Sequence, residues 1–162
     1  MRKGRRLGID VGKARVGLAI SDQDGILASP FETVPRPSTP HETAVLIGKA
    51  IDDYSFLEAY VGLPVSLAGT STESTIDALR VAYAISEVCG LEVRLVDERL
   101  TTVSASANLR LAGKTTKNSR SVIDQEAAAI ILEQALATEK NSGTQPGRAL
   151  DDFERPQDEP AE

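Results

Sequence analysis

The chain has 162 residues, of which 41% are hydrophobic and 26% are charged, as is typical of a single globular domain. Its apolar runs are too short to span a membrane and its N-terminus lacks an apolar signal region, so we expect a cytoplasmic protein with no membrane partner. Cys89 is the only cysteine and His41 the only histidine, which excludes an internal disulfide and a cysteine-based zinc site. Any catalytic metal must therefore have oxygen ligands, which favours Mg²⁺ or Mn²⁺.

Short apolar runs predict five strands, at residues 5–11, 15–21, 26–34, 58–63 and 91–96. Apolar residues at helical spacing predict four helices, at residues 41–55, 73–88, 102–112 and 120–138. This order predicts one α/β domain over residues 1–138, a mixed five-stranded sheet flanked by helices. Gly, Pro, Gln, Asp and Glu predominate after Asn141, so we expect residues 139–162 to form a disordered acidic tail.

The formal charge of −6 is unevenly distributed along the chain. Residues 139–162 hold seven acidic and three basic residues, so residues 1–138 are nearly neutral. Basic residues of this domain gather in two clusters, one formed by Arg2, Lys3, Arg5 and Arg6 and the other by Lys114, Lys117 and Arg120. Such clusters can hold phosphates, and a solvated flank is the alternative for both.

Asp10 directly follows the first predicted strand and precedes Gly12. A carboxylate at this place is either a turn former or a site residue. Gly8, Gly12 and Gly17 surround it in the sequence, and we expect them to leave backbone clear for a phosphate and a metal. This favours a site residue.

Asp97 and Glu98 follow the fifth predicted strand, at the carboxyl end where open α/β sheets tend to bind ligands. Neighbouring residues of a strand face opposite ways, so only one of the two can point toward Asp10. We favour Glu98, and Asp97 remains a nearly equal alternative.

Asp124 lies on the apolar stripe of its predicted helix, which also contains Ala127, Ala128, Ile131 and Ala135. A carboxylate on the packed side is costly unless charge or hydrogen bonds compensate it. A helix-start residue stabilised by the helix dipole is the alternative. Three acidic residues without histidine, namely Asp10, Glu98 and Asp124, indicate a Mg²⁺ or Mn²⁺ phosphodiesterase site, where the cations activate water and stabilise the leaving oxygen.

Four segments resemble the YqgF (RuvX) family: LGIDVGKARVGLAISD at 7–22, VGLPVSLAGT at 61–70, VDERLTT at 96–102 and VIDQEAAAIILEQAL at 122–136. The resemblance covers roughly residues 5–138. It implies an RNase H-like fold related to the Holliday junction resolvase RuvC. It also implies a nuclease that matures the 5′ end of 16S ribosomal RNA precursors, with four-way DNA junctions as the alternative substrate.

Carried over by position, the resemblance implies that the catalytic and metal-binding residues are Asp10, Glu98 and Asp124. We expect a nucleic-acid partner, either an rRNA precursor or branched DNA. The candidate nucleic-acid-binding residues are Lys13, Arg15, Arg99, Thr101, Thr102, Lys114, Lys117 and Arg120.

Two other classes of protein are compatible with parts of the sequence. Asp-x-Gly followed by a hairpin also resembles the phosphate-binding turn of actin-like sugar kinases, but 162 residues do not supply the second lobe that encloses ATP in those enzymes. A non-catalytic module that holds RNA or a ribosome-assembly partner has no need of clustered carboxylates facing phosphate. The pattern leaves a monomer or a homodimer open, including one linked through Cys89 if that residue is exposed. We expect His41 to be a surface residue.

Overall fold

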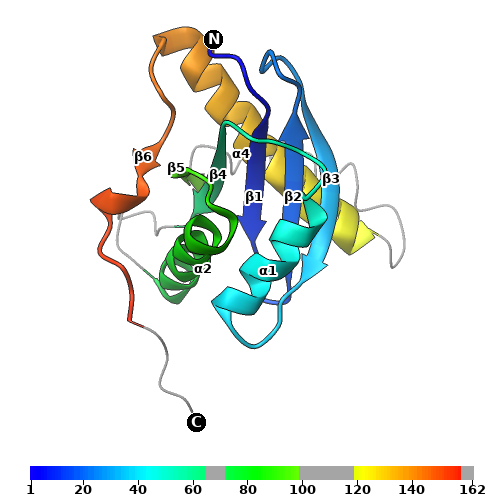
Figure 1. The fold of residues 1–162 in the computed structure, drawn as a ribbon, viewed down its shortest axis with the longest axis vertical. Helices are drawn as coiled ribbons and strands as arrows, with labels where there is room; N and C mark the ends of the chain where they lie inside the picture. The colour runs from blue at the N-terminus through cyan, green and yellow to red at the C-terminus, as the bar shows by residue number, and fades with distance from the viewer. Residues whose placement is uncertain (65–71, 99–118, 158–162) are drawn as a thin grey trace.

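The computed structural model describes residues 1–64, 72–98 and 119–157, which form one mixed sheet with helices on both faces (Figure 1). The strands are β1 (Arg6–Val11), β2 (Arg15–Ser21), β3 (Ala28–Pro35), β4 (Glu58–Leu63), β5 (Val93–Asp97) and β6 (Arg148–Ala149). The helices are α1 (Pro40–Ala50), α2 (Glu73–Cys89), α4 (Ser119–Ser142) and the short 3₁₀ helix η2 (Leu150–Asp152). The α/β prediction is confirmed, with a sixth short strand added to the expected five. The predicted helix at 102–112 lies outside the described residues.

The strand order of the sheet is β3-β2-β1-β4-β5-β6. β1, β2 and β3 form an antiparallel meander, whereas β1, β4 and β5 run parallel to one another. Parallel strands end at the same edge of a sheet. The segments that follow β1, β4 and β5 therefore emerge together, which brings residues far apart in sequence to one edge.

Strand alternation divides the core into two layers. On one face, Leu7 and Ile9 of β1 pack with α1 and α2, which Figure 1 shows side by side in cyan and green. On the other face, Tyr60 of β4 and Val96 of β5 pack beneath α4. Residues 8 and 10 of β1 share this second face. No helix in the described ranges is both long and apolar enough to cross a membrane.

Local sequence fixes where the α1/α2 layer begins and ends. Thr39 caps α1 by accepting a hydrogen bond from the backbone N–H of Glu42. Thr72 and Thr75 form a reciprocal capping box at the start of α2, and Gly90 ends that helix in the left-handed conformation, with φ of 66°. The Thr75 hydroxyl also donates to the Pro64 carbonyl oxygen, which places the N-terminus of α2 beside the carboxyl end of β4.

Composition predicted a disordered tail from residue 139, whereas the structure places the end of α4, β6 and η2 within residues 139–157. α4 continues to Ser142, and β6 then pairs antiparallel with β5. Leu150 is only 8% exposed, and the Tyr83 hydroxyl donates to the carbonyl oxygen of Phe153 at 2.6 Å. The composition of the segment did not indicate these contacts, because its average hydropathy is polar although a few apolar residues pack against the domain.

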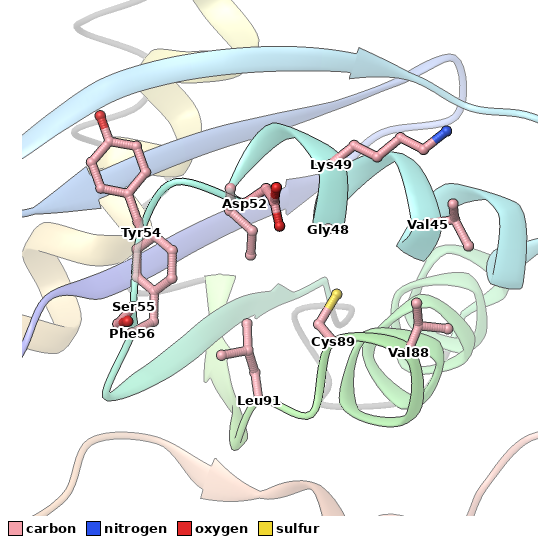
Figure 2. A pocket seen from close by; sticks show the side chains of 11 residues that line it. Val45, Gly48, Lys49, Asp52, Tyr54, Ser55, Phe56, Val88, Cys89 and Leu91 are labelled. Carbon is pink, nitrogen blue, oxygen red and sulfur yellow. The ribbon is translucent and has the colours of Figure 1, made fainter.

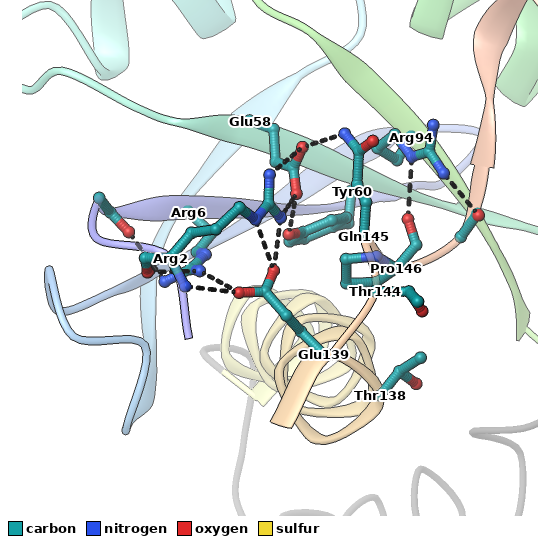
Figure 3. A network of polar contacts seen from close by, with 12 residues as sticks. Arg2, Arg6, Glu58, Tyr60, Arg94, Thr138, Glu139, Thr144, Gln145 and Pro146 are labelled. Carbon is teal, nitrogen blue, oxygen red and sulfur yellow. Dashed lines mark hydrogen bonds and ion pairs between the residues drawn. The ribbon is translucent and has the colours of Figure 1, made fainter. Parts of the chain in front are cut away.

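A buried ionic network ties the N-terminus to β4 and to the end of α4 (Figure 3). Arg2 pairs with both Glu58 and Glu139, and Arg6 donates to Glu139 at 2.8 Å. Arg6 and Glu58 have no exposed surface. Burial alone would raise the pKa of Glu139, but the hydrogen bonds from Arg2 and the charge of Arg6 outweigh it and hold that pKa below its ordinary value.

Most residues of the N-terminal basic cluster are therefore engaged in contacts within the protein. This differs from both sequence interpretations, a phosphate-binding cluster and a solvated flank. Lys3 pairs with Asp24, and the Arg5 guanidinium lies 5.1 Å from the centre of the Tyr54 ring. The run of basic residues made Arg2 and Arg6 candidates for phosphate binding. Their glutamate partners are distant in sequence, so the sequence did not indicate these ion pairs.

Candidate active site

Asp10 lies near the carboxyl end of β1, on the face covered by α4, and is partly buried. Its carboxyl group is close to those of Glu98 and Asp124. Burial raises the pKa of Asp10 to about 8, and the charge of Glu98, a hydrogen bond with Glu98 and the charge of Asp124 act in the same direction. The structure thus brings the three predicted carboxylates into one electrostatic cluster.

Glu98, rather than its neighbour Asp97, forms the hydrogen bond with Asp10. Strand alternation explains the difference. Val96 belongs to the layer beneath α4, so two residues further on Glu98 returns to that face, whereas Asp97 has the opposite parity. A Cβ placed on Gly62 would lie 3.5 Å from the Glu98 Oε1 atom, which locates this carboxylate over β4.

Asp124 is presented by α4, on the stripe that the sequence predicted. Ala128, Ile131 and Ala135 of this stripe are buried against the sheet. Asp124 is the sixth residue of a helix that begins at Ser119. The helix dipole acts mainly on the first turn, and Asp124 lies beyond it. The alternative interpretation of Asp124 as a helix-start residue is therefore not supported.

Two glycines allow α4 to lie close to the strands that carry the site. A Cβ on Gly8 would lie 2.6 Å from the Ala128 carbonyl oxygen, and one on Gly17 would overlap the carbonyl of Asp124. The expectation that Gly8 and Gly17 leave backbone clear for a phosphate is therefore wrong, because the helix backbone fills that space. Their absent side chains instead set the height of Asp124 above the sheet.

Arg15 of β2 provides a positive charge at the cluster. Its Nε atom donates to the Asp124 Oδ2 atom at 2.7 Å, and the two side chains are 35% and 20% exposed. Arg15 shares its face of β2 with Gly17, directly beneath Asp124. The sequence interpretation identified both residues separately but not their contact, because 109 positions separate them.

Arg36 supports the turn that follows Asp10, and no local sequence pattern indicates this role. Its Nη1 atom donates to the Gly12 carbonyl oxygen at 3.1 Å, and its Nη2 atom donates to the Asp77 Oδ1 atom at 3.0 Å. The Arg36 backbone N–H also donates to the carbonyl oxygen of Ala14. One side chain thus joins the turn, the end of β3 and α2.

The predicted nucleic-acid contacts are described only in part. Lys13 is exposed in the turn between β1 and β2, and Arg15 pairs with Asp124. Arg120 lies in the first turn of α4. The remaining five candidates fall outside the described residues: Arg99, Thr101, Thr102, Lys114 and Lys117.

The donor set suits a hard divalent cation, because all three clustered groups are carboxylates. Two close carboxyl groups, Asp10 and Glu98, share a hydrogen bond that requires a proton between them, and a cation would relieve the same repulsion. No group of three acidic, histidine or cysteine side chains in the described part of the chain is already arranged around an ion position. The third carboxylate, Asp124, is held by Arg15 instead.

A cavity of about 630 Å³ lies elsewhere, between the ends of α1 and α2 (Figure 2). Its lining includes Lys49, Tyr54 and Cys89 and none of the three clustered carboxylates. Cys89 is partly buried and its Sγ atom contacts the Ala44 carbonyl oxygen at 3.6 Å. Cys89 is thus a small residue at the boundary of the core rather than a fully exposed thiol. His41 is exposed, as predicted.

The mixed sheet, the covering α4 helix and the carboxylates at the ends of β1 and β5 define a protein of the RNase H-like class. The family model described as "RuvX: Holliday junction resolvase" matches residues 4–138, and the chain belongs to this family. The expected family membership is thereby confirmed.

Curated relatives resemble the chain over nearly its whole length. A protein of Leifsonia xyli subsp. xyli is 47% identical, with 93% of this chain and 97% of the relative covered. A Streptomyces avermitilis protein is 46% identical with the same coverage, and one from Mycobacterium leprae is 44% identical, with 92% and 86% covered. All three bear the name "Putative pre-16S rRNA nuclease".

Among solved structures, T. thermophilus RuvC in complex with a Holliday junction substrate aligns with a TM-score of 0.57. The alignment covers 88% of this chain and 98% of RuvC, at 16% sequence identity. This likeness establishes the shared fold.

Proposed function

We propose that this chain is a divalent-metal-dependent nuclease that hydrolyses phosphodiester bonds in the 5′-end maturation of a 16S rRNA precursor in the cytoplasm. The observation that carries the proposal is the convergence of Asp10, Glu98 and Asp124 on the α4 face of the sheet. The names of the curated relatives supply the substrate class.

Asp10 and Glu98 would hold the cation, and Asp124 would complete the ligand set from α4. Mg²⁺ or Mn²⁺ bound there would activate the attacking water and stabilise the leaving oxygen. The backbones that carry these side chains are fixed, because Asp10 belongs to the paired strand β1 and the Asp124 carbonyl packs over Gly17.

Basic and hydroxyl side chains would bind the strand that is cut. Lys13 is exposed beside the carboxylate cluster and is suited to hold a flanking phosphate. We assign the same role to Arg15 and to the remaining sequence candidates: Arg99, Thr101, Thr102, Lys114, Lys117 and Arg120.

A four-way DNA junction is the second candidate substrate. The description of the family as Holliday junction resolvases and the fold shared with RuvC favour it, and the same carboxylates would serve either phosphodiester. The two substrates therefore have to be separated by experiment.

The test is cleavage of a 16S precursor 5′ end and of a four-way junction by the same preparation, with Mg²⁺, with Mn²⁺ and with EDTA. We expect metal-dependent cleavage that is faster on the RNA and is lost in the Asp10→Asn variant. Preferential cleavage of the junction would transfer the assignment to recombination. Cleavage that survives both EDTA and the Asp10→Asn change would refute the proposed site.

A further inference from the structure

The Arg15–Asp124 ion pair occupies the carboxylate that the proposed metal site needs from α4. Arg15 Nε donates to Asp124 Oδ2 at 2.7 Å. A guanidinium in this place neutralises one of the three clustered negative charges.

The backbones on both sides of this ion pair are fixed. Arg15 belongs to β2, which pairs with β1 and with β3. Asp124 is anchored because its carbonyl lies directly over Gly17. Any exchange of partners must therefore occur by side-chain rotation, on the fast timescale of rotamer changes.

The exposure of the pair permits such an exchange. Arg15 is 35% exposed, so its guanidinium can be reached from solvent while its stem lies on the sheet. A guanidinium binds a phosphate in the same two-pronged geometry in which it binds a carboxylate. A phosphodiester arriving at this edge thus offers Arg15 an equivalent partner.

We infer that Arg15 is a positioning residue that competes with the divalent cation for Asp124 until a phosphodiester draws the guanidinium away. The inference rests on the proposed metal site. It couples the two ligands: nucleic acid tightens metal binding by releasing Asp124, and by linkage the metal tightens nucleic-acid binding equally.

Binding of Mn²⁺ to the full chain without nucleic acid, measured by isothermal titration calorimetry, tests this competition. Arg15→Gln removes the competing charge, and we expect Mn²⁺ to bind about three- to tenfold more tightly. Arg15→Lys keeps the charge and should remain within about threefold of the wild type. Lys49→Gln removes an exposed charge from α1, on the opposite face of the sheet, and should change the affinity by less than about twofold.

The coupling is tested in a second arm with an RNA oligonucleotide carrying phosphorothioate linkages, with the Asp10→Asn protein as the blank for metal bound by the RNA. We expect the oligonucleotide to tighten Mn²⁺ binding to the wild type, and this effect to be largely lost in Arg15→Gln. Unchanged or weaker Mn²⁺ binding by folded Arg15→Gln would overturn the role of Arg15. Mn²⁺ binding that does not depend on Asp10 in either protein would instead overturn the metal site itself.

Discussion

Burial and two neighbouring carboxylates distinguish the environment of Asp10 from that of a surface carboxylate. Burial, Glu98 and Asp124 all disfavour its charged form and raise its pKa to about 8. The clustered negative charge that would attract a cation therefore destabilises the metal-free fold at neutral and alkaline pH. This trade between function and stability can be measured without any substrate.

We predict that the metal-free protein loses stability as the pH rises from about 4 to about 8. In this window the folded state keeps a proton on Asp10 that the unfolded chain has released, so the free energy of unfolding falls with increasing pH. Asp10→Asn carries no such charge, and at pH 8 in EDTA we expect it to be more stable than the wild type by roughly 2–5 kcal/mol, with little difference at pH 4.

Thermal melts of both proteins across this pH range provide the measurement. Asp53→Asn is the matched control, because Asp53 is exposed and its substitution should leave the slope unchanged. A wild-type protein that is as stable as Asp10→Asn at pH 8 would show that Asp10 is not under electrostatic strain.

At this scale the sequence picked out three carboxylates that the structure brings together, but it did not indicate their pairings. The helical stripe placed Asp124 toward the sheet, because a 100° period is a local property. Partners such as Arg15 for Asp124 depend on how β2 and α4 meet, which no local pattern encodes.

At the level of elements, the contact between α4 and the β1–β2 hairpin determines the geometry of the site. Gly8 and Gly17 have no side chain where the helix backbone passes. The sequence analysis expected these glycines to make room for a phosphate. A glycine has the same sequence signature whether a phosphate or a helix backbone packs against it.

Gly17→Ala should displace α4 from the sheet, because its Cβ would overlap the Asp124 carbonyl. We expect a loss of about 1–3 kcal/mol in unfolding free energy, measured by urea denaturation, together with weaker Mn²⁺ binding. The control is Gly48→Ala within α1, where the nearest atom is Cys89 Sγ at 3.4 Å and helix propensity favours alanine by about 0.5–1 kcal/mol. Equal stabilities of the two variants would contradict the tight packing at Gly17.

At the scale of the molecule, residues 2–6 and 139–153 pack against the rest of the described domain. The N-terminal Arg2 and the end of α4 meet at Glu139, and Gln145 donates to Glu58 at 2.6 Å (Figure 3). Beyond this network, residues 148–153 lie along β5 and contact Tyr83 of α2. The mixed sheet flanked by helices followed from the predicted order of strands and helices, but this closing segment did not.

Leu150→Ala tests whether the closing segment contributes to the stability of the domain. Leu150 is 8% exposed within the core formed with α2, so truncation should cost about 2 kcal/mol or more in unfolding free energy. Leu27→Ala is the matched control, because Leu27 is 63% exposed and should tolerate the change within about 0.5 kcal/mol. A neutral Leu150→Ala would support the disordered tail that composition predicted.

The central claim is that Asp10, Glu98 and Asp124 form one metal-dependent catalytic site, with Glu98 rather than Asp97 facing the helix α4. Single-turnover cleavage of the 16S precursor in Mg²⁺ by Glu98→Gln and Asp97→Asn tests it most directly, because the two residues are adjacent and differ in the face they occupy. We predict that Glu98→Gln lowers the cleavage rate by about a hundredfold or more, and that Asp97→Asn lowers it by less than about tenfold. Retention of the full rate by Glu98→Gln, with the loss falling on Asp97→Asn, would contradict this site.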